Sequence, residues 1–170
     1  MALIFTVESG SGSASATSYT SVATADDFIA LNKHETAWTS ATNAQKENAL
    51  MRATLILDDN VVWYGSMANS NQALQWPRLG VFDKYGNEID FKTIQSWLKN
   101  ATAELARTLH SEDRDADPDT LGFSSLSVRS LSIGVDKSDR RHVLPGSVIR
   151  MVNFYGRVQR AGGTIRLVRV

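Results

Sequence analysis

The chain has 170 residues and a mass of 18.7 kDa, the size of a single domain. Its apolar fraction of 42% can form one hydrophobic core and excludes a wholly disordered chain. Because it contains no cysteine, disulfides, thiolate metal sites and a cysteine nucleophile are excluded. No stretch approaches the about 18 apolar residues that cross a bilayer, and no basic segment precedes the short apolar run 2–5. We therefore expect a protein made in the cytoplasm, with no membrane partner.

The 18 basic and 18 acidic residues cancel, but they are unevenly distributed. Residues 1–123 contain nine Lys or Arg and 16 Asp or Glu, a net charge of −7, whereas residues 124–170 contain nine and two, a net charge of +7. A basic end can bind nucleic acid, or it can contact the acidic body of the next copy in a head-to-tail assembly. The charges alone leave both interpretations open.

The first third of the chain predicts a strand, a loop and a short helix. Residues 3–7 are β-prone, and the Ser/Gly/Ala-rich residues 9–18 predict a flexible loop. Thr24 precedes Asp27 by three positions, the spacing of a capping box, and therefore predicts a helix that ends near Asn32.

The clearest helix signal covers residues 42–59. Thr42 precedes Gln45 at capping-box spacing, and the apolar residues that follow lie on one helical face: Ala49, Leu50, Ala53, Ile56 and Leu57. The carboxylates of Asp58 and Asp59 at its end are interpreted as a solvated, capping pair rather than a catalytic one.

Residues 72–90 predict an irregular crossing segment. Trp76 must be extended because a proline follows it, Gly80 permits a turn, and residues 83–87 suggest a tight turn. Asp90 can then cap a third helix over residues 91–110.

The last third predicts an acidic loop at residues 111–120 and strand-like alternation at 125–135, with a phase slip at Arg129–Ser130 that a bulge or hairpin bend explains. Pro145 and Gly146 begin a last helix over residues 146–160. Residues 164–170 form a β-prone tail.

Together these elements predict a mainly α fold: a small bundle of about four helices with a β-hairpin or extended loop and a β-prone C-terminal arm. Residues 1–160 form one domain and residues 161–170 the arm. A terminal strand with no partner in its own domain leaves backbone groups unpaired, so we expect the arm to pair with another chain.

The best metal signal is the alternation of Asp113, Asp115 and Asp117, the first three positions of an EF-hand loop. The sixth position is Pro118 where a glycine is needed, and the twelfth is Ser124 where a glutamate is needed. We therefore interpret the segment as a solvated acidic loop.

No other motif indicates a metal site, a cofactor site or catalysis. Neither a G-x-S-x-G elbow nor a phosphate-binding glycine loop occurs, and the histidines lie in separate segments without zinc-site spacing: His34, His110 and His142. We expect no enzyme activity, no metal and no cofactor.

Nucleic-acid binding needs cations interleaved with aromatic rings. The closest match is the set Arg150, Phe154, Tyr155, Arg157 and Arg160. At helical spacing the Tyr155 ring lies on the apolar face, so core packing explains it, while the arginines can contact either phosphate or an acidic protein. The rings of the tryptophans at 63, 76 and 97 are expected in the core; that of Trp38 is undecided.

Several segments resemble one family of small tailed-phage proteins, the DnaT-like single-stranded-DNA-binding proteins, over roughly residues 1–135. The specific parts are the helix segment K-E-N-A-L-M-R-A-T at 46–54 and the segment Q-A-L-Q-W-P-R-L-G-V at 72–81. Weaker matches are S-Y at 18–19, A-D-D-F at 25–28, Trp38, L-D at 57–58, K-N-A at 99–101 and E-L-A at 104–106.

Members of this group also resemble head–tail connector (neck adaptor) proteins. That resemblance implies a structural virion protein that forms a homo-oligomeric, twelvefold ring beneath the portal and joins capsid to tail. Its partners would be the portal and a downstream neck or tail-completion protein. The genome would pass through the channel of the ring without specific binding. The protein would lie in the virion neck, and in the host cytoplasm before assembly. The alternative is a DnaT-like protein that binds single-stranded DNA in phage replication, although the net charge of −7 in residues 1–123 opposes phosphate binding.

Residue roles follow from the adaptor interpretation. In the crossing segment, Trp76 fills a core pocket, Pro77 prevents helix formation, Arg78 can pair with a carboxylate and Gly80 permits the turn. The expected interface with neighbouring subunits or the portal consists of the arm and three arginines: Thr164, Ile165, Arg166, Leu167, Val168, Arg169, Val170, Arg150, Arg157 and Arg160.

Overall fold

The computed structural model describes residues 4–32, 36–114, 116, 125–128, 131–134 and 142–159. Within these residues the helices are α1 (Val22–Ile29), α2 (Ala37–Ser40), α3 (Asn43–Asn60), α4 (Ser96–Ser111) and α5 (Gly146–Val152). The strands are β1 (Val61–Trp63), β2 (Ser66–Met67), β3 (Arg78–Leu79), β4 (Ser125–Val128), β5 (Leu131–Gly134) and β6 (Gly156–Val158). No helix in the described part of the chain is both long enough and apolar enough to cross a membrane.

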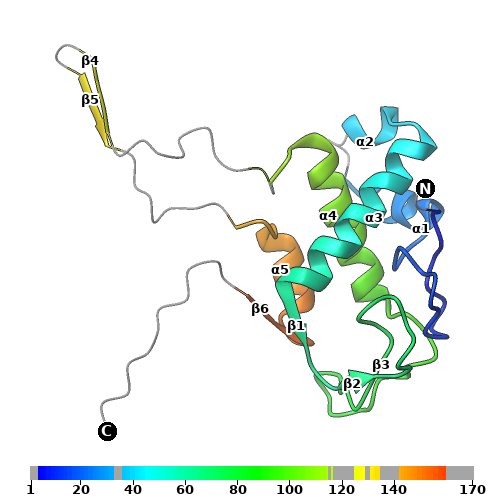
Figure 1. Ribbon diagram of the computed structural model, residues 1–170. Coiled ribbons are helices and arrows are strands. Elements are labelled where there is room, and N and C mark those ends of the chain that lie inside the picture. The colour runs from blue at the N-terminus through cyan, green and yellow to red at the C-terminus, as the bar shows by residue number, and fades with distance from the viewer. Residues whose placement is uncertain are drawn as a thin grey trace, which may run out of the picture.

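Helix α3 begins where the capping-box pattern predicts. The Thr42 hydroxyl accepts a hydrogen bond from the Gln45 backbone N–H (3.3 Å), and the Gln45 side-chain oxygen accepts one from the Thr42 backbone N–H (2.9 Å). Its buried face packs along α4, which also contacts α1, α2 and α5 and is therefore the central element of the core (Figure 1).

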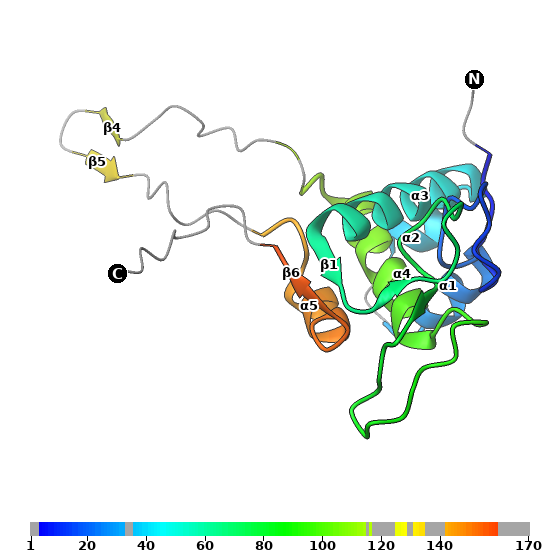
Figure 2. The same ribbon diagram turned by 60° about the horizontal axis from the view of Figure 1, so that its bottom comes forward.

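The predicted mainly α bundle is wrong, because the described residues form a mixed α/β fold. They contain three two-stranded antiparallel sheets, which pair β1 with β6, β2 with β3 and β4 with β5. The β1–β6 sheet joins segments far apart in the sequence, and it lies beside α5 at one end of α3 (Figures 1 and 2). The β4–β5 hairpin occupies the segment where the alternation predicts strands.

The predicted helix over 146–160 is shorter than expected, and a turn and a short strand follow it. Helix α5 ends at Val152, and after a turn the chain pairs with β1 as β6. A Cβ atom at Gly156 would lie 2.6 Å from Val61 Cγ1, so this close pairing of β6 with β1 requires glycine. Local periodicity could not reveal a pairing partner about 95 residues away.

Two helix starts also differ from prediction. Ser21, not Thr24, caps α1: its hydroxyl accepts a hydrogen bond from the Thr24 N–H (3.2 Å). Helix α4 begins at Ser96 rather than near residue 91, because the Asp90 carboxylate accepts a hydrogen bond from Lys92 N–H (2.9 Å) and closes a local turn instead.

The Ser/Gly-rich segment after residue 8 folds around a buried carboxylate. Glu8 is 2% exposed, and its two oxygens accept hydrogen bonds from the backbone N–H groups of Gly10 (2.8 Å), Gly12 (3.0 Å) and Ser13 (2.8 Å). The Ser13 carbonyl accepts a further hydrogen bond from the N–H of Ala73 (3.0 Å). The loop is thereby joined to the crossing segment between β2 and β3.

Candidate nucleic-acid interface

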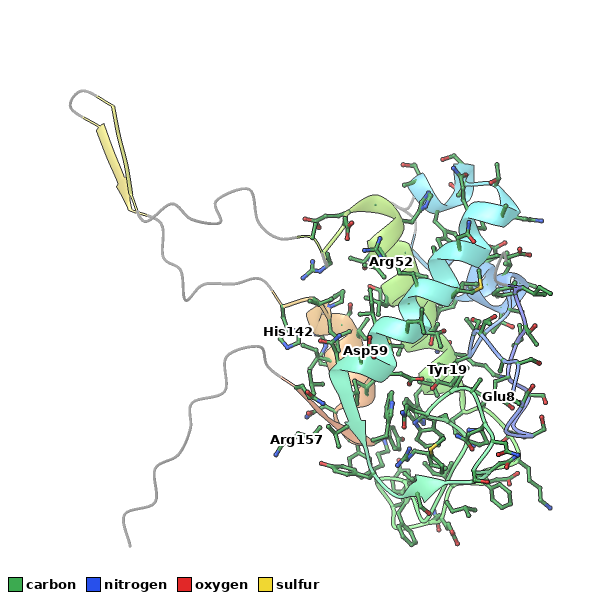
Figure 3. All side chains as sticks on the ribbon, viewed as in Figure 1. Glu8, Tyr19, Arg52, Asp59, His142 and Arg157 are labelled. Atoms are coloured by element: carbon green, nitrogen blue, oxygen red, sulfur yellow. The ribbon has the colours of Figure 1, made fainter. Side chains whose placement is uncertain are left out.

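The β1–β6 sheet has a buried face and an outer face. Val61 and Trp63 are buried, whereas Val62 and its register partner Arg157 are exposed. Tyr64 continues the outward phase of β1 and is 51% exposed. In Figure 3 the Arg157 side chain extends away from the helices.

The turn after α5 carries a second exposed ring close to this end of the sheet. The carbonyl of Tyr155 accepts a hydrogen bond from Tyr64 N–H (3.0 Å), which places the turn beside the end of β1. Phe154 is 52% exposed and lies edge-on to the Tyr155 ring, with centroids 5.2 Å apart. We call Val62, Tyr64, Phe154 and Arg157 the aromatic–arginine surface. It offers two rings and a guanidinium to solvent.

An interior cluster of aromatic rings supports this surface. The Tyr155 ring stacks on Trp97, with centroids 4.0 Å apart and planes 8° from parallel. Trp97 in turn packs against Trp63 (5.9 Å) and Trp76 (5.3 Å). The core positions predicted for Trp63 and Trp76 are confirmed, and Trp97 is half-buried against the core. The exposed Phe154 ring therefore contacts the edge of a packed aromatic cluster through Tyr155.

A half-buried carboxylate, that of Asp58, links this cluster to the N-terminal segment. Both oxygens of Asp58 accept from the Tyr19 hydroxyl (2.7 Å each), and they also accept from Trp63 Nε1 (3.1 Å) and Gln75 N–H (3.0 Å). The Tyr19 oxygen accepts a hydrogen bond from Trp76 N–H (3.2 Å). The interpretation of Asp58 as a solvated, capping residue is therefore wrong.

Burial has the largest effect on the pKa values of Asp58 and Tyr19. It raises the pKa of Asp58 to about 6 despite the hydrogen bonds from Gln75, Tyr19 and Trp63, which act in the opposite direction. Burial, with the Asp58 charge next, also raises the pKa of Tyr19 well above its ordinary value. These groups are hydrogen-bonded to one another, and they connect the N-terminal segment, α3, β1 and the crossing segment.

Arg78 binds carbonyl groups rather than the carboxylate that we expected. Its guanidinium donates to the backbone oxygens of Tyr64 (2.7 Å), Gly65 (2.8 Å) and Gln75 (3.1 Å). The Arg78 side chain thereby connects the crossing segment to the backbone of Tyr64 and Gly65, at the end of β1. Trp76 is fully buried and is joined to Pro77 by a cis peptide bond, and Gly80 has a φ of 70°, the left-handed conformation that its expected turn requires.

The other expected interface residues are only partly described. Arg150 is exposed in the last turn of α5, and Arg157 is exposed on β6. Arg160 and the arm residues 164–170 lie outside the described residues. Tyr155 does stack inward as expected, although from a turn rather than from a helix face.

Sequence reasoning overlooked Val62 and Tyr64. The alternation of buried and exposed residues from Val61 to Tyr64 is the signal that could have identified a strand with an outward-facing tyrosine. The missing information was the pairing with β6, which brings the backbone of Tyr64 beside the turn that carries Phe154.

The described residues contain no cluster of three or more potential metal ligands. Asp113, the first position of the EF-hand-like pattern, pairs with Arg52 across a distance of 2.8 Å. Asp115 and Asp117 lie outside the described residues.

A comparison with protein families matches residues 1–133 to the family described as "Putative DnaT-like ssDNA binding protein". The match covers α1 to α4 and the β1 side of the aromatic–arginine surface, and it ends before α5 and β6. No curated protein and no solved structure matches the chain. Since the match spans well over half of the sequence, the chain belongs to the family of "Putative DnaT-like ssDNA binding protein" members.

Proposed function

We propose that the protein binds single-stranded DNA on the aromatic–arginine surface. The observation that carries this proposal is the pair of half-exposed rings, Tyr64 and Phe154, on the two segments that the β1–β6 pairing brings together, with the exposed Arg157 on β6. Unpaired bases stack on aromatic rings irrespective of sequence, and a neighbouring cation contacts the phosphates. Paired bases cannot offer their faces in this way, so the surface favours single strands.

The family assignment supports the same function, whereas the net charge limits the affinity for DNA. The exposed Asp59, at the end of α3 and two residues before β1, places a negative charge near the proposed site (Figure 3). With few cations in the described surface, we expect moderate affinity with a shallow dependence on salt, about 0.7 in the slope of log K per cation contact.

The test is binding of a labelled oligo(dT) by fluorescence anisotropy at several salt concentrations. Combined Y64A and F154A substitutions are expected to weaken binding by at least about 10-fold, because stacking on each ring is lost. R157Q is expected to reduce the salt slope by about 0.7. The matched controls are L55A, an exposed apolar side chain on α3, and R52Q, an exposed arginine on the same helix. Wild-type affinity in the Tyr64/Phe154 double variant would refute the site.

A structural adaptor remains the second candidate, and the division of charge favours it. Residues 1–123 carry a net charge of −7 and residues 124–170 a net charge of +7, as a head-to-tail ring of identical subunits would use. In this proposal the partners are other copies, the portal and a tail-completion protein, and the place of action is the virion neck. Negative-stain imaging with and without portal protein tests this proposal. Ring-shaped oligomers that form only with the portal would support the adaptor, whereas dispersed particles under both conditions would count against it.

A further inference from the structure

A short hairpin between β3 and α4 carries the most exposed aromatic ring among the described residues. Phe82 and Glu88 form an antiparallel bridge, and the Asp83 N–H donates to the Asn87 carbonyl (2.8 Å). Tyr85, within the turn, is 76% exposed. This part of the chain extends beyond the helices at the bottom of Figure 2.

The turn is locked by one carboxylate. Asp83 Oδ1 accepts hydrogen bonds from the N–H groups of Tyr85 (2.8 Å) and Asn87 (2.9 Å), and Oδ2 accepts one from Asn87 Nδ2 (3.2 Å). These hydrogen bonds, led by that from the Asn87 backbone, lower the pKa of Asp83, so the carboxylate stays ionised and keeps the turn closed. The Tyr85 backbone is thus fixed before any ligand binds.

A cation accompanies the exposed ring. Lys84 Nζ lies 4.8 Å from the centroid of the Tyr85 ring. A ring with a cation beside it is the pair of groups that a nucleotide needs, one for the base and one for the phosphate. An exposed carboxylate, Glu88, follows on the returning strand of the hairpin and opposes phosphate binding there.

The hairpin begins beside the end of β1. After burial, the charges of Asp83 and then Lys84 are the groups that act on the pKa of Tyr155, and the backbone of Tyr155 is bonded to Tyr64. The base of the hairpin also lies against Gly65, the residue after Tyr64, because a Cβ atom at Gly65 would lie 2.8 Å from Val81 Cγ2, and the Val81 carbonyl accepts a hydrogen bond from Ile89 N–H (2.8 Å). We therefore expect a strand that stacks on Tyr64 to pass within reach of the hairpin.

We propose that Lys84 and Tyr85 form a base-stacking finger: Tyr85 stacks on an unpaired base next to those held by Tyr64 and Phe154, and Lys84 contacts the adjoining phosphate. The finger rests on the proposed function and extends its site by one nucleotide. Unlike α5 and β6, it lies within the residues that match the family.

The experiment compares finger variants of the full chain in the oligo(dT) assay, with a duplex of equal length as second ligand. Y85A is expected to weaken binding of single strands about 10-fold and to leave duplex binding unchanged, while Y85F, which keeps the ring face, is expected to stay within about 2-fold of wild type. K84Q is expected to lower the salt slope by about 0.7, and E88Q to strengthen binding. All three side chains replaced are exposed, and circular dichroism checks that each variant is folded.

The outcomes separate the finger from the function on which it rests. If wild type and the controls bind single strands but Y85A binds equally well, the finger is wrong and the proposed function stands. If Y85A instead abolishes self-association in sedimentation while DNA binding is unchanged, the tip is a protein contact and the finger is again refuted. Absence of binding by the wild-type protein overturns both proposals.

Discussion

Replacing Tyr19 by phenylalanine tests the network that joins the N-terminal segment to the aromatic cluster. The substitution removes one hydroxyl and preserves the ring, which is completely buried. That hydroxyl donates to both oxygens of Asp58 and accepts from the Trp76 N–H, so Y19F deprives a half-buried carboxylate of a donor and a buried amide of its acceptor.

The two losses have different pH dependence, which allows them to be separated. An unpaired buried N–H costs about 1–3 kcal/mol at any pH, and a hydrogen bond to a charged group contributes about 1.5–3 kcal/mol. The second loss requires ionised Asp58, whose pKa is about 6. We therefore expect Y19F to lower the free energy of unfolding by about 4 kcal/mol at pH 8 and by about 2 kcal/mol at pH 5.

The measurement is urea unfolding of wild type and Y19F at both pH values, followed by tryptophan fluorescence and, independently, by circular dichroism. Tyr19 itself stays protonated throughout this range, because burial raises its pKa well above the ordinary value. An equal loss of stability at pH 5 and pH 8, or a loss below about 1 kcal/mol at both, would contradict the account of the network.

Three further substitutions test single features of the fold. Burial raises the pKa of Asp58 from 3.8 to about 6, so the native state binds a proton more readily than the unfolded state. The free energy of unfolding therefore falls by roughly 3 kcal/mol as pH rises from about 4 to above 6. We expect D58N to remove this pH dependence from the stability measured by urea titration. G156A is expected to destabilise the protein by more than about 2 kcal/mol, since its Cβ would lie 2.6 Å from Val61 Cγ1, and an unchanged melting temperature would disprove the close β1–β6 approach. T42A removes the side-chain half of the capping box with Gln45 and should cost about 1 kcal/mol in thermal unfolding; a stability equal to that of wild type would show that the cap is unimportant.

The parts of the fold that depend on neighbouring residues were predictable from the sequence. The start of α3 followed from Thr42 and Gln45, because a capping box is completed within one helical turn. The start of α4 was misplaced because a carboxylate such as that of Asp90 can cap a helix or close a turn, and the local sequence allows both.

The parts that depend on distant pairing were not predictable. The local sequence of β6 predicts the end of a helix. Only its pairing with Val61–Trp63 shows that this segment is a strand. The same pairing determines the candidate site: the sequence supplies the rings of Tyr64 and Phe154, but their exposure and the hydrogen bond that joins their two segments follow from tertiary contacts. The tryptophans were assigned to the core by size and hydrophobicity, which says nothing of the network that Asp58 forms around them.

The carboxylate of Glu8 has a practical consequence for anyone who shortens or tags this protein. Three amide hydrogens of the following loop are oriented toward it, and that loop also contacts residues 69–73 and 92–93. Trimming the chain beyond residue 7 would leave those amides pointing at one another with no anion between them, loosening remote segments together with the removed end. Affinity handles are therefore better appended ahead of Glu8 than substituted for the residues around it.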